Sequence, residues 1–220
     1  MKAFHNDKNI KDKYMSRIEA HIRADELIKG KYWEHGKGCA VGCTIHSSDH
    51  GLYETEMGIP RILARLEDDI FEGLPNNLAK TWPKRFLKAI KVGADLSNVW
   101  PQFAHWLMLD GKYGVIQLAK TKQQKEAIQR VGDLYQAKSQ GLVVDIEDWR
   151  LARGATYAAA YAAYAAYAAA TYAANAAAYA AATYAANAAA YATYAAAAAK
   201  RYEWRTAQSE KLLELLRDAK

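Results

Sequence analysis

Charge is missing from one long part of this chain. Residues 155–199 are 45 consecutive residues made only of 30 Ala, 9 Tyr, 4 Thr and 2 Asn, whereas 25% of the 220-residue chain is charged. The same stretch lacks Leu, Ile, Val and Phe, and polar side chains recur throughout it. Alanine contributes little transfer energy, so we expect a helix in water and no membrane span.

Cysteine is scarce as well, and two residues in the whole chain exclude a disulfide-stapled secreted domain. The first 30 residues lack the unbroken apolar core of a signal peptide, so we expect a cytoplasmic protein with reduced cysteines. Apolar residues make up 51% of the chain, which excludes an intrinsically disordered protein. The net charge of +6 is spread along the chain without a basic block, so nucleic-acid binding is not predicted.

Familiar catalytic motifs are also absent from the sequence. There is no Gly-rich phosphate loop after a strand, no serine elbow and no pair of histidines at the metalloprotease spacing. The sequence therefore limits the architecture more closely than it limits the chemistry.

Helical spacing of apolar residues accounts for most of the remaining chain. The pattern predicts helices over residues 7–29, 60–73, 82–93, 97–107 and 121–140, with another that begins at 145–148. In the second of these, Ile62, Leu63, Leu66 and Ile70 should face inward, and Glu67, Asp68 and Asp69 should face outward. The run 142–144 is the one segment that suggests a strand.

The Ala/Tyr stretch contains a repeat. Residues 171–179 recur at 183–191 with a period of 12, which turns the tyrosine face of a helix by about a third of a turn. We therefore predict two helices with a break near 180–183, since one straight helix would be about 68 Å long. Residues 204–216 should form an amphipathic closing helix.

Taken together, these patterns predict an all-α helical bundle. Its amino-terminal helical region, residues 1–144, contains a cluster of cysteine and histidine residues. The Ala/Tyr-rich helical region, residues 145–220, should pack on it as a carboxy-terminal layer, so that both regions form one compact unit.

Both cysteines and two histidines lie within one short segment, with the spacing C-x3-C-x2-H-x3-H. The four residues are Cys39, Cys43, His46 and His50. Thiolate and imidazole are the ligands that zinc prefers, so zinc is the candidate cofactor. A straight helix could not bring all four to one ion, whereas a loop could.

Three other interpretations of this segment remain open. The cysteines fit as small core residues, with the histidines in the core or at the surface. Alternatively, one cysteine is a nucleophile activated by His46 or His50, with Asp49 or Glu54 orienting the base. In the third, the segment binds a polar ligand without a metal, and Asp49, Tyr53 and Glu54 supply the hydrogen-bonding groups.

Several segments resemble a family of bacterial immunity proteins that are encoded beside polymorphic toxins. The resemblance lies in residues 38–48, Tyr53-Glu54, Gly58-Ile59-Pro60, the Ala-rich helices and the closing segment 204–216. It implies a mostly helical protein that neutralises its partner, a cognate toxin or effector, by stoichiometric binding. It implies no catalytic residues.

Two functions from different classes follow. The first is a cytoplasmic binding protein with a protein partner, as the resemblance implies. The alternative is a metal- or thiol-dependent enzyme, or a small-molecule-binding protein, centred on residues 39–50.

Overall fold

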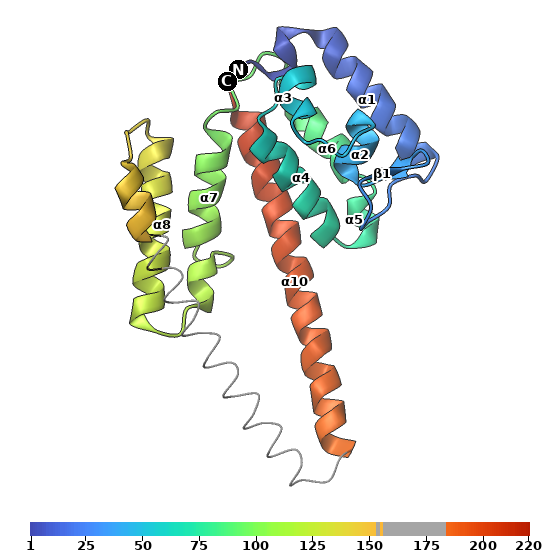
Figure 1. Ribbon diagram of the computed structural model, residues 1–220. Coiled ribbons are helices and arrows are strands. Elements are labelled where there is room, and N and C mark those ends of the chain that lie inside the picture. Colours follow the sequence, from blue (N-terminus) through green and yellow to red (C-terminus); the bar gives the residue numbers. More distant parts are fainter. Residues whose placement is uncertain (153–154, 156–183) are drawn as a thin grey trace. The chain divides into compact units, whose positions relative to one another are not determined.

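The computed structural model describes residues 1–152, 155 and 184–220, and for residues 184–198 it describes the backbone alone. Within these ranges the fold is all-α, as predicted from the sequence (Figure 1). The predicted break near 180–183 and most of the Ala/Tyr repeat lie outside the described residues. No helix in the described ranges is long and apolar enough to cross a membrane.

The described part of the chain contains the following labelled helices. They are α1 (Lys8–Arg23), α2 (Ala40–Ile45), α3 (Leu52–Met57), α4 (Arg61–Gly73), α5 (Asn76–Ala79), α6 (Trp82–Ala89), α7 (Val99–Leu109), α8 (Lys122–Ser139) and α10 (Tyr184–Asp218), with 3₁₀ helices η1 (Ala3–Asn6) and η2 (Val115–Leu118). Residues 146–152 are helical as well. Strands β1 (Trp33–Glu34) and β2 (Lys37–Gly38) pair antiparallel, with Trp33 opposite Gly38.

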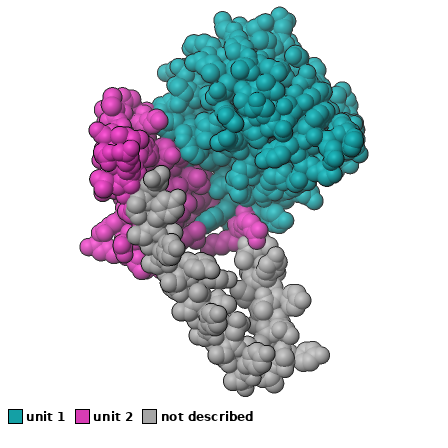
Figure 2. Space-filling model, viewed as in Figure 1, with its two compact units in different colours: residues 1–103, 202–220 teal, residues 104–201 magenta. Residues whose placement is uncertain are grey.

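The chain divides into two compact units, coloured separately in Figure 2. The first unit comprises Met1–Phe103 and Tyr202–Lys220, and the second comprises Ala104–Arg201. The boundary predicted after residue 144 therefore lies inside the second unit. The closing segment, predicted to belong with the Ala/Tyr region, belongs to the first unit.

The core of the first unit lies between α1, α2, α4 and α6, in which α2 and α6 each contact the other three helices. Its largest fully buried side chains include Trp82, Tyr14, Tyr53, Phe4 and Phe71. The indole Nε1 of Trp82 donates a 2.9 Å hydrogen bond to the carbonyl oxygen of Glu67. Burial of such aromatic side chains supplies much of the stabilisation of a unit this size.

The end of α10 closes the first unit. Its apolar face, Leu212, Leu213 and Leu216, is buried. Two ion pairs hold its outer face: Arg205 with Asp69 of α4 at 2.5 Å, and Arg85 of α6 with Glu210 at 2.7 Å. The amphipathic closing helix was correctly predicted, but residues 184–218 form one continuous helix that includes it.

Several predicted elements differ in their limits or orientation. Helix α1 ends at Arg23, well before Gly30, because Asp25 adopts a left-handed φ of 54° and starts a loop. The strand predicted at 142–144 is absent from the structure, and the short β1–β2 ladder was not predicted.

The helix predicted over 60–73 is confirmed as α4, and Leu63 and Ile70 are buried as predicted, but Ile62, Glu67 and Asp68 were assigned to the wrong faces. Ile62 is exposed, whereas Glu67 and Asp68 are only 0% and 8% exposed. Glu67 follows Leu63 by four residues and precedes Phe71 by four, so it lies on the apolar stripe of the helix. The inner face of α4 therefore carries two acidic side chains into the first unit.

The second unit contains the pairing of the end of α7 with α8. A Cβ atom at Gly132 would overlap the side chain of Leu109, so glycine permits the close approach of the two helices. The ring of His105 contacts the carbonyl oxygen of Gly132 at 3.0 Å. The predicted start of helix α8 is confirmed by the capping box of Thr121 and Gln124.

Candidate functional site

The cysteine and histidine segment forms α2 and the loop that follows it. Cys39 caps the amino terminus of α2, where its Sγ accepts a 3.5 Å hydrogen bond from the backbone N–H of Gly42. His46 ends the helix in the left-handed conformation, with φ 56°. Both cysteines are buried and free.

Two glycines set the position of this helix. A Cβ atom at Gly38 or Gly42 would overlap the backbone carbonyl oxygen of Tyr32, which passes directly over the start of α2. The N–H of Cys39 donates to the carbonyl oxygen of Lys31 at 2.7 Å. The glycines therefore allow residues 31–33 to lie against α2 and to contribute side chains beside it.

The four predicted zinc ligands separate into two pairs with different partners. Cys39 and His50 lie beside Asp68 of α4, with His50 Nε2 at 3.5 Å from Asp68 Oδ2. Cys43 donates to the carbonyl oxygen of Gly38 at 3.4 Å, and His46 faces His21 of α1. No group of three or more His, Cys, Asp or Glu in the described ranges is arranged to hold a metal ion.

In the described structure the four residues therefore have separate partners. A helix of six residues between Cys39 and His46 holds the two cysteines on successive turns, and each thiol already contacts a different neighbour. Zinc binding by this protein stays a hypothesis.

The thiols are poorly suited to nucleophilic attack. Burial raises the pKa of Cys39 well above its usual range, and the carboxylate of Asp68 adds to the rise. Burial also raises the pKa of Cys43, to about 12. Because the thiolate is the reactive form, this environment suppresses the reactivity of both cysteines near neutral pH.

The residues predicted to orient a base or bind a polar ligand have local roles. Asp49 Oδ1 accepts from the N–H of Gly51 at 2.8 Å and shapes the loop. Glu54 Oε1 accepts from the N–H of Arg61 at 2.7 Å, at the start of α4. Tyr53 is fully buried, and its hydroxyl donates to Glu67 Oε2 at 2.6 Å.

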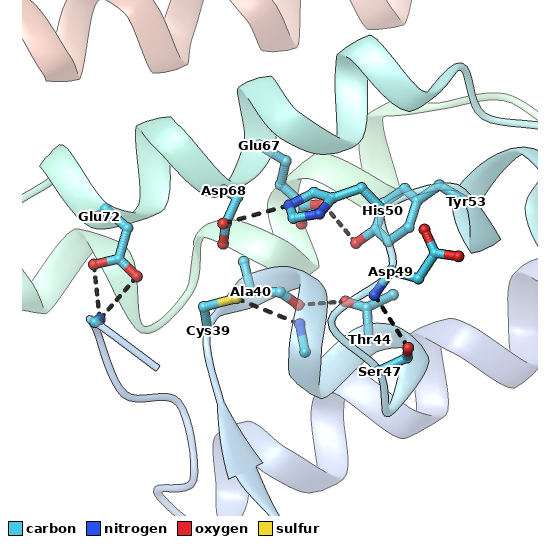
Figure 3. A network of polar contacts seen from close by, with 12 residues as sticks. Cys39, Ala40, Thr44, Ser47, Asp49, His50, Tyr53, Glu67, Asp68 and Glu72 are labelled. Atoms are coloured by element: carbon cyan, nitrogen blue, oxygen red, sulfur yellow. Dashed lines mark hydrogen bonds and ion pairs between the residues drawn. The ribbon is translucent and has the colours of Figure 1, made fainter. Parts of the chain in front are cut away.

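A pocket of about 320 Å³ opens beside the Cys39 and His50 pair. We call it the acidic pocket, and its lining residues are Gly30, Lys31, Tyr32, Cys39, Asp68 and Glu72. Glu67, Asp68 and Glu72 all come from α4, and Figure 3 shows Asp68 above Cys39 with Glu72 further along the helix. His50 extends the site, since its ring meets that of Tyr32 edge to face at 5.6 Å.

The acidic groups at this site are only partly satisfied. Asp68 Oδ1 and Glu67 Oε1 are buried, and neither has a hydrogen-bond partner in the described part of the chain. Burial raises the pKa of Glu67 well above its usual range. Burial also raises the pKa of Glu72, whose two oxygens both lie 3.0 Å from the N–H of Gly30.

The sequence analysis missed the acidic residues of this pocket. Asp68 and Glu72 were assigned to the outer face of a helix or left without a role. The spacing of Glu67 from Leu63 and Phe71 was the one signal in the sequence that an acidic side chain faces inward.

Comparison of the chain with protein-family models, with curated proteins and with solved structures finds no match. The function is therefore argued below from the geometry of the site.

Proposed function

We propose that this protein acts by binding and that the acidic pocket recognises a positively charged nitrogen group, an ammonium or a guanidinium. The observation that carries the proposal is Asp68, a residue that lines the pocket and whose buried Oδ1 lacks a hydrogen-bond partner among the described residues. A buried carboxylate oxygen without a partner is unfavourable, and a cationic donor in the pocket would remove that penalty.

The charge around the pocket supports a cationic ligand. Asp68 and Glu72 line it with carboxyl groups, and the nearby ammonium group of Lys31 is already paired with Glu34 at 2.8 Å. The ring of Tyr32 is half exposed at the rim, where it can stack on a guanidinium or an ammonium group. The volume of about 320 Å³ suits a small head group or one long basic side chain.

The state of the thiols favours binding over thiol catalysis. Cys39 lines the pocket, but its raised pKa leaves little thiolate to attack a bound substrate. Its buried sulfur instead caps α2 and forms part of the wall.

Two sources of the cationic group agree with this chemistry. One is a free small amine or guanidine. The other is a lysine or arginine side chain of a protein partner, which would agree with the resemblance to immunity proteins and with stoichiometric neutralisation of a toxin or effector.

Titration of the full-length protein with methylguanidinium, n-butylamine and a short arginine-containing peptide tests the proposal. Binding should shift the backbone amide signals of residues 30–32 and 68 in NMR spectra. Asp68→Asn should weaken binding by about tenfold or more, because it removes the carboxylate charge. Asp69→Asn is the matched control, since Asp69 lies on the same helix but pairs with Arg205 outside the pocket.

The probes also separate the two sources. Binding of the free amine or guanidine as tightly as of the peptide indicates a small-molecule ligand. Binding of the peptide alone indicates a protein partner, and co-expression with the toxic product of a neighbouring gene should then protect cells unless Asp68 is replaced. If no probe binds the wild type, or if Asp68→Asn binds equally well, the proposal is wrong.

A further inference from the structure

A second arrangement of side chains, around His21 and His46, includes none of the residues that line the acidic pocket. His21 of α1 and His46 at the end of α2 face each other through their Nε2 atoms, which are 2.8 Å apart. Their rings are nearly perpendicular, with an interplanar angle of 86°. At this distance only one proton fits between the two nitrogens, so at least one Nε2 lone pair faces the gap.

A carboxylate orients the inner histidine. Glu26 Oε2 lies 2.6 Å from His21 Nδ1. Because a carboxylate accepts hydrogen bonds, His21 carries its proton on Nδ1 and leaves Nε2 free to act as a ligand. In many metalloproteins a carboxylate accepts the Nδ1 proton of a histidine in this way and orients the other ring nitrogen toward a metal ion.

The outer histidine is held in place and accessible at the same time. The ring of His46 stacks on that of Trp33 of β1, with centroids 4.5 Å apart and an interplanar angle of 13°. The left-handed backbone of His46 at the end of α2 aims the ring back toward α1. His46 is exposed whereas His21 is buried, so an ion can reach the pair from solvent.

We infer that the His21 and His46 pair is a binding site for one divalent transition-metal ion, zinc in the first instance. Two imidazoles would ligate the ion, Glu26 would orient His21 from outside the coordination sphere, and water would occupy the remaining positions. The site differs from the four-residue set predicted from the sequence, of which it keeps only His46.

The geometry requires a small adjustment. Zinc to nitrogen bonds of about 2.0 Å at a tetrahedral angle place two ligand nitrogens about 3.3 Å apart. The pair therefore has to open by about half an ångström, which rotation of the exposed His46 ring can provide. If the pair is neutral, His46 moves its proton from Nε2 to Nδ1 on binding. If the pair carries one extra proton, that proton is released to solvent.

Charged neighbours act in both directions. Glu26 favours a cation, whereas the guanidinium of Arg17 in α1, which donates to the carbonyl oxygen of Thr44 at 3.0 Å, opposes it. The thiol of Cys43 also lies near Glu26, but it donates to backbone carbonyl oxygens.

The experiment is a calorimetric titration of full-length protein, without a histidine tag, with zinc chloride. His46→Asn should lower the zinc affinity by about tenfold or more, and Glu26→Gln should lower it by about tenfold while both ligands remain. The matched control is His35→Asn, because His35 is 91% exposed, lies close by in the sequence and has a similar left-handed φ of 50°. Asparagine tolerates that conformation at both positions, so neither variant should disturb the backbone.

A second readout follows the nitrogens directly. In NMR spectra that correlate imidazole nitrogens with ring protons, zinc should shift both Nε2 signals of His21 and His46 in the wild type and in His35→Asn, and should not shift the His21 signal in His46→Asn. The inference is overturned if His46→Asn binds zinc as tightly as the wild type. It is equally overturned if Cys43→Ser abolishes binding while His46→Asn does not, since the ligands would then be the cysteines.

Discussion

Replacing Glu67 by glutamine should remove a pH dependence of stability that the wild type carries. Glu67 is 0% exposed, and burial raises its pKa well above the usual value. The folded protein therefore keeps a proton that the unfolded chain releases above about pH 4.5. Because the folded state binds more protons, the free energy of unfolding falls as the pH rises, by about 1.4 kcal/mol per pH unit up to the native pKa of Glu67.

Urea denaturation of the wild type and Glu67→Gln at several pH values between about 5 and 7 measures this slope. Glutamine can still accept the hydrogen bond of Tyr53, but it does not titrate. The free energy of unfolding of the variant should therefore change less with pH, by the contribution of Glu67. The pKa of Glu72 is raised as well, so the free energy of unfolding should still fall somewhat with rising pH in both proteins. Glu214→Gln, at a half-exposed surface pair with Lys211, should follow the wild type. Parallel curves for the wild type and Glu67→Gln would refute the reasoning.

Two further predictions concern α2. In a thermal or urea denaturation assay, Gly42→Ala should destabilise the protein by about 2 kcal/mol or more, because the added Cβ overlaps the backbone oxygen of Tyr32. Gly111→Ala is the control and should be nearly neutral, because the space around Gly111 is open. Cys43, with a pKa of about 12, should react with iodoacetamide at least about a hundredfold more slowly in the folded protein than in urea, and equal rates would contradict its burial.

The helices of this protein were predictable because their signals are local. The proline and glycine punctuation around α4 and the capping box of α8 each depend on a few neighbouring residues, and both helices have nearly the predicted limits. The end of α1 was not predictable in the same way. It depends on Asp25 adopting a left-handed conformation, which places the following loop over α2.

The candidate site was less predictable because it depends on contacts between distant segments. Cysteine and histidine spacing singled out a segment in which Cys39 lines a pocket and His50 lies beside Asp68. The spacing could not identify Asp68 of α4 or His21 of α1 as their partners, because these lie far away in the sequence. The apolar face of a helix is recognised from several apolar residues together, and one acidic residue on that face changes the pattern little. The inward position of Glu67 was therefore overlooked.

The two arrangements beside α2 separate chemically. On one side, buried carboxyl groups and a half-exposed tyrosine ring favour a cationic nitrogen group. On the other, two facing imidazoles favour a transition-metal ion. Asp68→Asn should leave zinc binding unchanged, and His46→Asn should leave amine or guanidine binding unchanged, so failure of one proposal is distinguishable from failure of the other.

The most direct test of the central claim is the titration of the wild type and Asp68→Asn with methylguanidinium, followed by NMR. The account predicts saturable shifts at residues 30–32 and 68 in the wild type and in Asp69→Asn, and binding weakened by about tenfold or more in Asp68→Asn. Equal binding by the wild type and Asp68→Asn, or saturable shifts that map away from the acidic pocket, would contradict it.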